Sequence, residues 1–214
     1  MTLRNMTWSS RSSTMTRSMI TATVAAGALL LMAGTAAAQS TTGTITINGS
    51  VAPKCAVTAG GSGGTFAATV ELGELSGADG TLLASLAATP AASTPFTSNF
   101  SLKCTGSNVG VSVTASALQH MAAGAAPTGY TKTINLTGRA SIDLVGAATT
   151  PLIVDDLSSS GGATTSSFGN GAFLANTSNN VRVSAFGFNT APNASNILVA
   201  GSYVGTVVVV LTPS

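Results

Sequence analysis

The sequence predicts an all-β fold in which two sheets pack face to face as a sandwich. In several short segments apolar residues recur with a period of two, which is typical of strands with one buried face. Clusters of Gly, Ser, Asn and Pro separate these segments and favour turns. Hydrophobic residues make up 44% of the 214-residue chain but aromatic residues only 5%, so we expect a core built mainly from Ala, Val, Leu and Ile.

The first 38 residues are expected to form a cleaved secretory signal peptide. Three arginines precede an uncharged run whose apolar centre spans 25–33, and small residues at Ala36 and Ala38 fit cleavage before Gln39. The strongly apolar stretch is shorter than the roughly 20 residues that a membrane-spanning helix needs. The sequence therefore predicts export of a mature chain, 39–214.

Charged residues are scarce, at 7% of the chain against roughly 25% in an ordinary soluble protein. The mature chain keeps five basic and six acidic residues, a formal charge of −1. This composition excludes the basic patch of a nucleic-acid-binding protein and argues against a metalloenzyme with clustered ligands. Strand faces that are so poor in charge favour a subunit that packs against copies of itself.

Several strands follow from the alternation, in chain order. The alternating segments that predict strands are 44–51, 96–104, 108–114 and 181–185, the last continuing to 188. Segments 133–136 and 142–145 are expected to form a hairpin around Thr137-Gly138-Arg139. The final segment, 203–211, is apolar on both faces, which predicts a central strand covered on both sides.

Two segments are expected to be loops. The glycine-rich run 60–64 lacks the Lys-Ser/Thr and the helix that follow a phosphate-binding loop, so we interpret it as a flexible hairpin loop. The Ala-rich segment 82–92 is also interpreted as a loop, because Pro90 and Pro95 bracket it.

Cys55 and Cys104 are the two cysteines of the chain. In an exported protein an isolated pair favours one disulfide, here with a sequence separation of 49 residues. Two free thiols or a metal pair are the alternatives. Both are weakened because export exposes thiols to oxidation and no His or third Cys is placed to help.

Candidate catalytic residues are few, and we expect no enzyme, no cofactor and no metal site. His120 is the single histidine, no G-x-S-x-G motif surrounds a serine, and we interpret His120 as a polar surface residue in a loop. Asp155 and Asp156 are adjacent, so on a strand they would point to opposite faces. We expect them to start a turn after the segment 151–154.

Three features occur in order along the mature chain. An alternating stretch, 42–51, runs into Pro53-Lys54-Cys55; a second cysteine, Cys104, ends a strand; and the chain closes with Ala200-Gly201-Ser202-Tyr203-Val204-Gly205 and a run of valines. Together they resemble the pilin subunits of chaperone–usher fimbriae, including the spore-coat-U-like branch. These families carry an alternating N-terminal extension, an early cysteine paired with one about fifty residues later, and such a terminal strand.

The resemblance implies an immunoglobulin-like, pilin-type sandwich, 54–214, that lacks its final strand, preceded by an N-terminal extension, 39–53. The missing strand would leave an apolar groove with unpaired backbone groups, which a segment of a neighbouring subunit fills by strand addition. The implied donor is 41–47. Its plugs would be Gly43, Ile45 and Ile47, and the implied groove residues on the last strand are Tyr203, Val207, Val209 and Leu211.

The function implied by the resemblance is that of a structural subunit of a surface fimbria or pilus, supporting adhesion or biofilm formation. Its implied partners are identical or related pilin subunits, a periplasmic chaperone and an outer-membrane usher, with no nucleic acid and no identified receptor. The chain would pass through the periplasm to the cell surface. Two alternatives stay open: a self-complete secreted sandwich serving as a coat, matrix or adhesion protein without that pathway, and a secreted enzyme or small-ligand binder.

Overall fold

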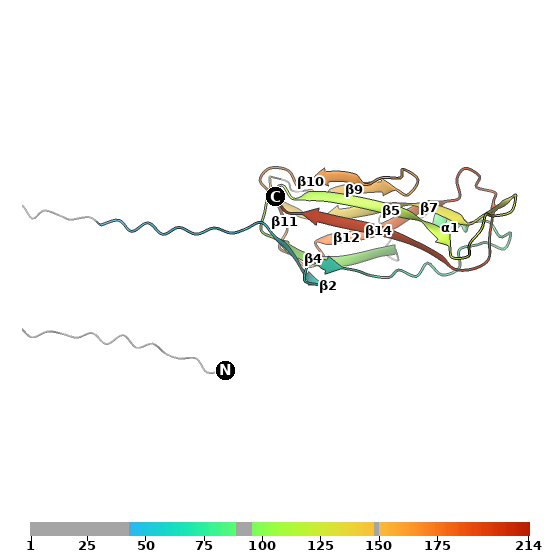
Figure 1. Cartoon of the computed structure of the whole chain (residues 1–214), viewed down its shortest axis with the longest axis horizontal. Coiled ribbons are helices and arrows are strands. Elements are labelled where there is room, and N and C mark those ends of the chain that lie inside the picture. The colour runs from blue at the N-terminus through green and yellow to red at the C-terminus, as the bar shows by residue number, and fades with distance from the viewer. Residues whose placement is uncertain (1–42, 89–95, 148–149) are drawn as a thin grey trace, which may run out of the picture. The chain divides into compact units, whose positions relative to one another are not determined.

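The computed structural model describes residues 43–88, 96–147 and 150–214. The predicted signal peptide, 1–38, lies outside the described residues. The chain divides into a leading unit that ends at Ile47 and a compact unit, Asn48–Ser214, which begins six residues before the predicted domain start at Lys54. Every described strand and helix lies in this compact unit (Figure 1).

The fold is all-β, as predicted, with one short helix among the described residues. The strands are β1 (Cys55–Ala59), β2 (Gly61–Ser62), β3 (Thr65–Phe66), β4 (Thr97–Cys104), β5 (Gly110–His120), β6 (Tyr130–Thr131), β7 (Thr133–Ile142), β8 (Leu144–Gly146), β9 (Leu152–Leu157), β10 (Thr164–Ser167), β11 (Ala172–Leu174), β12 (Val181–Asn189), β13 (Ile197–Leu198) and β14 (Tyr203–Thr212); the helix is α1 (Ala84–Ala87).

The strands form a sandwich whose two layers share β7. One layer has the order β1-β4-β12-β7-β9, and the other consists of β14, β5 and β10. The second half of β7 pairs with β12 and β9, while its first residues pair with the end of β5. These ladders are antiparallel, and Figure 1 shows β14 running beside β5 along the domain.

The core lies between the inward faces of these strands. On β7 the alternation is complete, since Ile134, Leu136, Gly138, Ala140 and Ile142 are buried and the residues between them are only half-buried. Two buried clusters result, one near the disulfide and one near α1, and Val207 on β14 packs against both. Burial of each large aliphatic side chain stabilises the fold by about 1.5–3 kcal/mol.

Three of the strands predicted from alternation are confirmed. The segments 96–104, 108–114 and 181–188 correspond to β4, β5 and β12. The hairpin predicted around Thr137-Gly138-Arg139 is wrong, because β7 runs without a break through these residues. Gly138 serves close packing instead of a turn: a Cβ atom built there would lie 2.7 Å from Cγ1 of Val207.

Four further expectations need correction. Residues 44–51 form no strand in the described chain, and the loop expected at 82–92 contains α1, with 89–92 outside the described residues. Asp155 and Asp156 lie within β9 and do not start a turn. The last strand, β14, is not a central strand, because among the described residues β5 is the only strand paired with it, and its outward face is not covered, because Val204, Val208 and Val210 are at least 50% exposed.

Two buried polar side chains connect strands that are distant in sequence. The side chain of Asn180 accepts a hydrogen bond from the N–H of Leu102 at 2.9 Å and donates to the carbonyls of Leu102 at 2.8 Å and Ala175 at 2.6 Å. The carboxylate of Asp156 accepts from the N–H of Ala115 and from the hydroxyl of Thr164, both at 2.8 Å. Each side chain thus satisfies backbone groups that the β-ladders leave unpaired.

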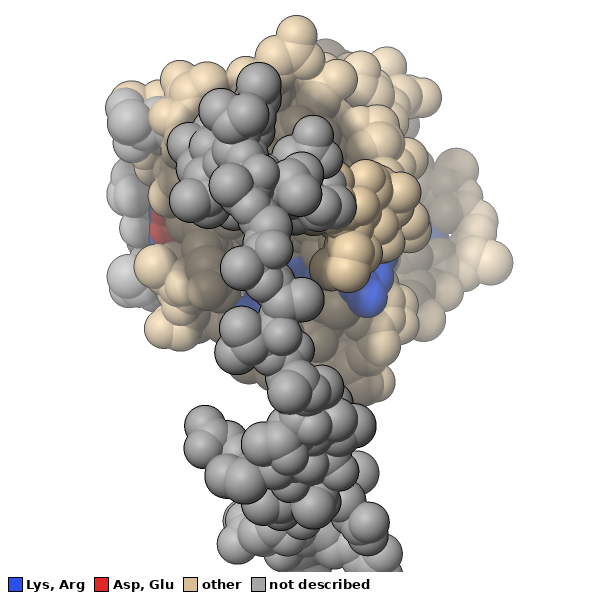
Figure 2. All heavy atoms as spheres, turned by 90° about the vertical axis from the view of Figure 1, so that its left-hand side faces the viewer, with Lys and Arg blue, Asp and Glu red and all other residues tan. Residues whose placement is uncertain are grey.

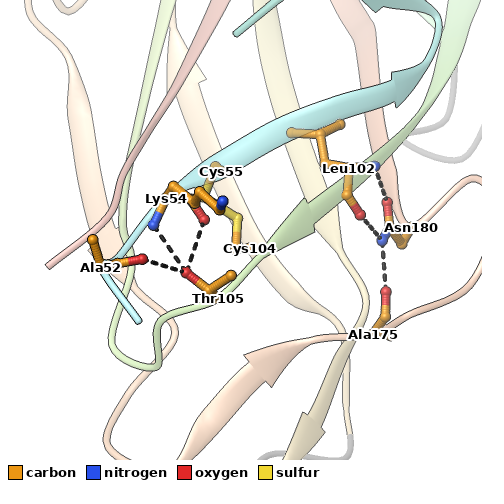
Figure 3. Close-up of a disulfide and its surroundings, with 8 residues drawn as sticks. All are labelled: Ala52, Lys54, Cys55, Leu102, Cys104, Thr105, Ala175 and Asn180. Carbon is orange, nitrogen blue, oxygen red and sulfur yellow. Dashed lines mark hydrogen bonds between the residues drawn. A yellow bond between two sulfur atoms is a disulfide. The ribbon is translucent and has the colours of Figure 1, made fainter. Parts of the chain in front are cut away.

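The predicted disulfide between Cys55 and Cys104 is confirmed. The two cysteines are opposite each other in the ladder that joins β1 to β4, at the end of the domain drawn in Figure 3. Asn180 lies close by and binds Leu102 of the same strand, so the covalent and the polar links both fasten β4 (Figure 3).

Replacing Cys55 by Ser is expected to lower the free energy of unfolding by about 4 kcal/mol, the chain-entropy value for a loop of this size. Thermal unfolding of the mature protein, followed by circular dichroism with and without reductant, measures the effect. The wild type under full reduction is the matched control, and its melting temperature should equal that of the variant. Equal melting temperatures of the oxidised wild type and the variant would contradict a stabilising role.

Replacing Asn180 by Leu introduces an apolar side chain of similar size and leaves three buried backbone groups without partners. Because each such group costs about 1–3 kcal/mol, we expect a loss of about 3 kcal/mol or more in chemical denaturation. The control is Asn176→Leu at an exposed position, where the change should stay within about 0.5 kcal/mol. Equal stabilities of the two variants would refute the role of the Asn180 side chain.

Candidate assembly groove

The last strand has the burial pattern of an edge strand whose inward face is incompletely covered. Along β14 half-buried residues alternate with exposed ones, and none of its ten residues is fully buried. The partner strand β5 differs, although its residues lie on the same face of the same sheet. Val111 and Val113 on β5 are buried, whereas Leu211 and Val209, which pair with them, are only half-buried.

An open apolar groove of 1520 Å³ follows β14. All residues from Tyr203 to Leu211 line it, both those that point inward and those that point outward, so the backbone edge of the strand faces the groove. The opposite wall comes from β1 and the segment 64–76, and the lining residues lie between 55 and 213. Core side chains form its floor: Phe96, Phe100, Leu102, Leu118, Leu136 and Val183.

Close packing at the centre of the sandwich fixes the position of β14. Val207 lies over Gly138, and Ala115 also borders this point, so the sheets approach where side chains are smallest. Further along, β14 and β5 pass through a β-bulge between Val204 and Thr206. Gly205 is required there, because a Cβ atom would lie 2.9 Å from the carbonyl oxygen of Ser116.

Tyr203 lines the groove near one end, where the residues before β14, 198–202, also border it. Its hydroxyl donates to the carbonyl of Val199 at 2.8 Å, and burial raises the pKa of the phenol above its usual range. The ring packs edge-on against His120, whose Nδ1 accepts from the N–H of Ala122 and whose Nε2 lies 3.0 Å from the carbonyl oxygen of Ala200. His120 is the last residue of β5, so the expectation that it lies in a loop is wrong. The contacts of its ring stabilise this end of the domain.

The other end of the groove lies at the disulfide. There the hydroxyl of Thr105 lies 3.0 Å from the N–H nitrogen of Lys54, 3.0 Å from the carbonyl oxygen of Ala52 and 3.4 Å from that of Lys54 (Figure 3). In addition, the N–H of Thr105 donates to the carbonyl of Lys54 at 2.9 Å. These bonds hold residues 52–54 against the turn that follows β4. They are the first hydrogen bonds that fasten the described N-terminal segment to the domain.

The predicted plug residues belong to that segment. Ile45 is 87% exposed and Ile47 is 91% exposed, and a Cβ atom built on Gly43 would meet no atom within 4 Å. Large aliphatic side chains with this exposure are unusual, since burying each one is favourable by about 1.5–3 kcal/mol. The structure thus contains an unfilled apolar groove and, separately, exposed isoleucines in an alternating sequence.

The candidate catalytic residues are not brought together. Asp155 points outward and forms an ion pair with Arg139, whereas Asp156 on the opposite face is buried, as expected for adjacent strand residues. His120, at the C-terminal end of β5, forms hydrogen bonds with Ala122 and Ala200 and with neither aspartate. In the described part of the chain no three His, Cys, Asp or Glu side chains cluster in a way that could hold a metal ion.

Charge contributes little to the surface. In the view of Figure 2 the described residues are mostly uncharged, with small separate patches of Lys and Arg. Two ion pairs account for four of the charges: Arg139 with Asp155, and Arg182 with Asp143. Hydrogen bonding to the carboxylate raises the pKa of each arginine further. Among the residues that the structure describes, the groove itself is lined by two carboxylates, Glu71 and Glu74, and by no Lys or Arg, so it offers apolar contacts and backbone pairing beside a slightly acidic wall.

The four residues that the resemblance implied on β14 line the groove, and their role as acceptors of a strand stays a prediction; the residues of the opposite wall were not predicted. Tyr203, Val207, Val209 and Leu211 all line the groove. Phe66, Leu72 and Leu75 belong to this wall, and their segment, 64–76, carries no strand signal in the sequence, because it forms only the two-residue strand β3 and has no regular period. The single usable signal was an isolated aromatic residue, Phe66, directly after a glycine-rich turn.

Comparison of the chain with protein-family models, with curated proteins and with solved structures finds no match in any of the three. Within the described residues, no helix is long and apolar enough to cross a membrane.

Replacing Gly205 by Ala is expected to push β14 away from β5 at the bulge and to destabilise the domain by about 1–3 kcal/mol, the usual cost of overpacking. Denaturant unfolding measures this change. Gly162→Ala is the matched control, because no atom lies within 4 Å of a Cβ built there, and it should be close to neutral. A Gly205 variant as stable as this control would show that the bulge tolerates a side chain.

Proposed function

We propose that this protein is a structural subunit of a surface fibre, in which a segment of one subunit completes the sandwich of the next. The observation that carries the proposal is the open groove along β14, an apolar channel with an exposed backbone edge. An edge strand of this kind pairs readily with an added strand. Its occupant needs unpaired backbone groups and apolar side chains at every second position.

The N-terminal segment of another copy meets both needs. Gly43, Ile45 and Ile47 alternate with threonines, so in an extended strand they share one face. Burying two isoleucines would contribute about 3–6 kcal/mol before the cost of association. Each new backbone hydrogen bond would add about 0.5–1.5 kcal/mol.

A contact of this kind is head-to-tail and therefore propagates. The donor segment and the groove are different surfaces, so a subunit at one end of a row keeps a free groove and a subunit at the other end keeps a free donor. Such a row grows into a filament unless the rotation between subunits closes it into a ring. The low charge of the strand faces agrees with close packing of many identical domains. The proposed contact involves only copies of this chain, so the fibre itself needs no second kind of subunit.

The proposal includes export of the chain and its protection by a chaperone. The basic start, apolar centre and small-residue exit of 1–38 support secretion. During transit the open groove would be an aggregation hazard, so a periplasmic chaperone would cover it until an outer-membrane usher orders assembly. The alternative of a self-complete secreted sandwich is less well supported, because the groove has no strand in it among the described residues.

Replacing Ile45 and Ile47 together by Asp is expected to abolish polymers, because two charges would have to enter an apolar groove. The measurement is the ladder of SDS-resistant species formed by the mature protein in unboiled samples, with electron microscopy of the same material. Thr44→Asp with Thr46→Asp is the matched control, since these residues share the opposite face of the strand. Undiminished ladders from the isoleucine variant would remove the donor assignment.

A further inference from the structure

The alternation that marks the donor does not stop at Ile47. Gly49 and Val51 continue the same face, and Asn48 and Ser50 continue the polar one. Val51 is 78% exposed and, like the residues before it, makes no hydrogen bond in the described structure. The pattern ends at Ala52, the first residue fastened to the domain.

The length of the groove fits the longer segment. The inward positions of β14 run from Tyr203 to Leu211, eight residue steps, and Gly43 to Val51 is also eight steps. At roughly 3.4 Å per residue each stretch spans about 27 Å. The shorter donor, 41–47, spans six steps, about 20 Å, and would leave part of the groove open.

Thr105 determines where the free segment begins. It binds both Ala52 and Lys54, and the disulfide at Cys55 follows at once (Figure 3). Pro53 between them restricts the backbone further. Gly106, next to Thr105, lies beside both Pro53 and Ser214. The free segment therefore begins at the end of the domain where β14 ends.

From these observations, and resting on the proposed function, we infer that the donated strand runs from Gly43 to Val51 and that Thr105 is the positioning residue of the joint between subunits. Only Ala52, Pro53 and Lys54 then connect one domain to the strand held by the next. Three residues reach at most about 10 Å, so consecutive domains are closely spaced. Because Thr105 fixes two of the three, the joint is stiff.

The first test extends the polymer assay to Val51. Val51→Asp is expected to shorten the lifetime of the SDS-resistant ladder by at least about tenfold, whereas Ser50→Asp on the opposite face should change it less than about twofold. If Val51→Asp matches Ser50→Asp while the Ile45/Ile47 variant loses its polymers, the extension to Val51 is wrong and the proposed function stands. If all of these variants polymerise like the wild type, the proposed function itself fails.

The second test addresses the joint. Thr105→Val keeps the shape of the side chain but removes its hydroxyl, so fibres should show a lower persistence length in electron micrographs. Thr105→Ser keeps the hydroxyl and should restore the wild-type stiffness. Both variants should match the wild type in monomer melting temperature, because Thr105 is exposed. Thr105→Val fibres as stiff as the wild type would overturn the positioning role.

Discussion

The unpaired edge of β14 is the constraint on which the account depends. An edge strand leaves every second N–H and C=O without a strand partner, and here its inward side chains are also half-buried. The side chains of β14 are not less hydrophobic than those of its neighbour: Val111 and Val113 on β5 are buried, whereas their partners on β14 are only half-buried. A single extended segment placed beside β14 would supply both the hydrogen bonds and the side chains that this edge lacks.

The rest of the fold holds this edge in place without the missing strand. Val207 is seated over Gly138, the β-bulge at Gly205 aligns β14 with β5, and the carboxylate of Asp156 pairs an N–H of β5 where β10 has ended. At the other wall, the disulfide and Asn180 fasten β4. A domain with an open groove depends on such local links because its core is less completely covered than that of a closed sandwich.

The sequence predicted the parts of the fold in which one face is buried. The alternation of β4, β5 and β12 follows directly from that burial, and the cysteine pair followed from its isolation in an exported chain. The error at Gly138 has a physical cause: a glycine needed for close approach of two sheets looks the same in sequence as a glycine needed for a turn. Likewise, apolar residues on both faces of β14 suggested a central strand, yet Val204, Val208 and Val210 are at least 50% exposed.

Other features could not be predicted from local patterns. The contacts of Asn180 with Leu102 and of Asp156 with Ala115 join residues 78 and 41 positions apart, and no spacing rule links them. The wall made by the segment 64–76 lacks a regular period, so its place depends on tertiary packing alone. The groove as a whole is a property of the register between strands, although its β14 residues could be named in advance through the resemblance.

The most direct test is the structure of the assembled polymer, determined by electron cryo-microscopy. The account predicts density for the N-terminal segment of one subunit lying beside β14 of the next, with Ile45 and Ile47 directed into the core. A polymer in which that edge of β14 stays empty, or is covered by a later part of its own chain, would contradict the account.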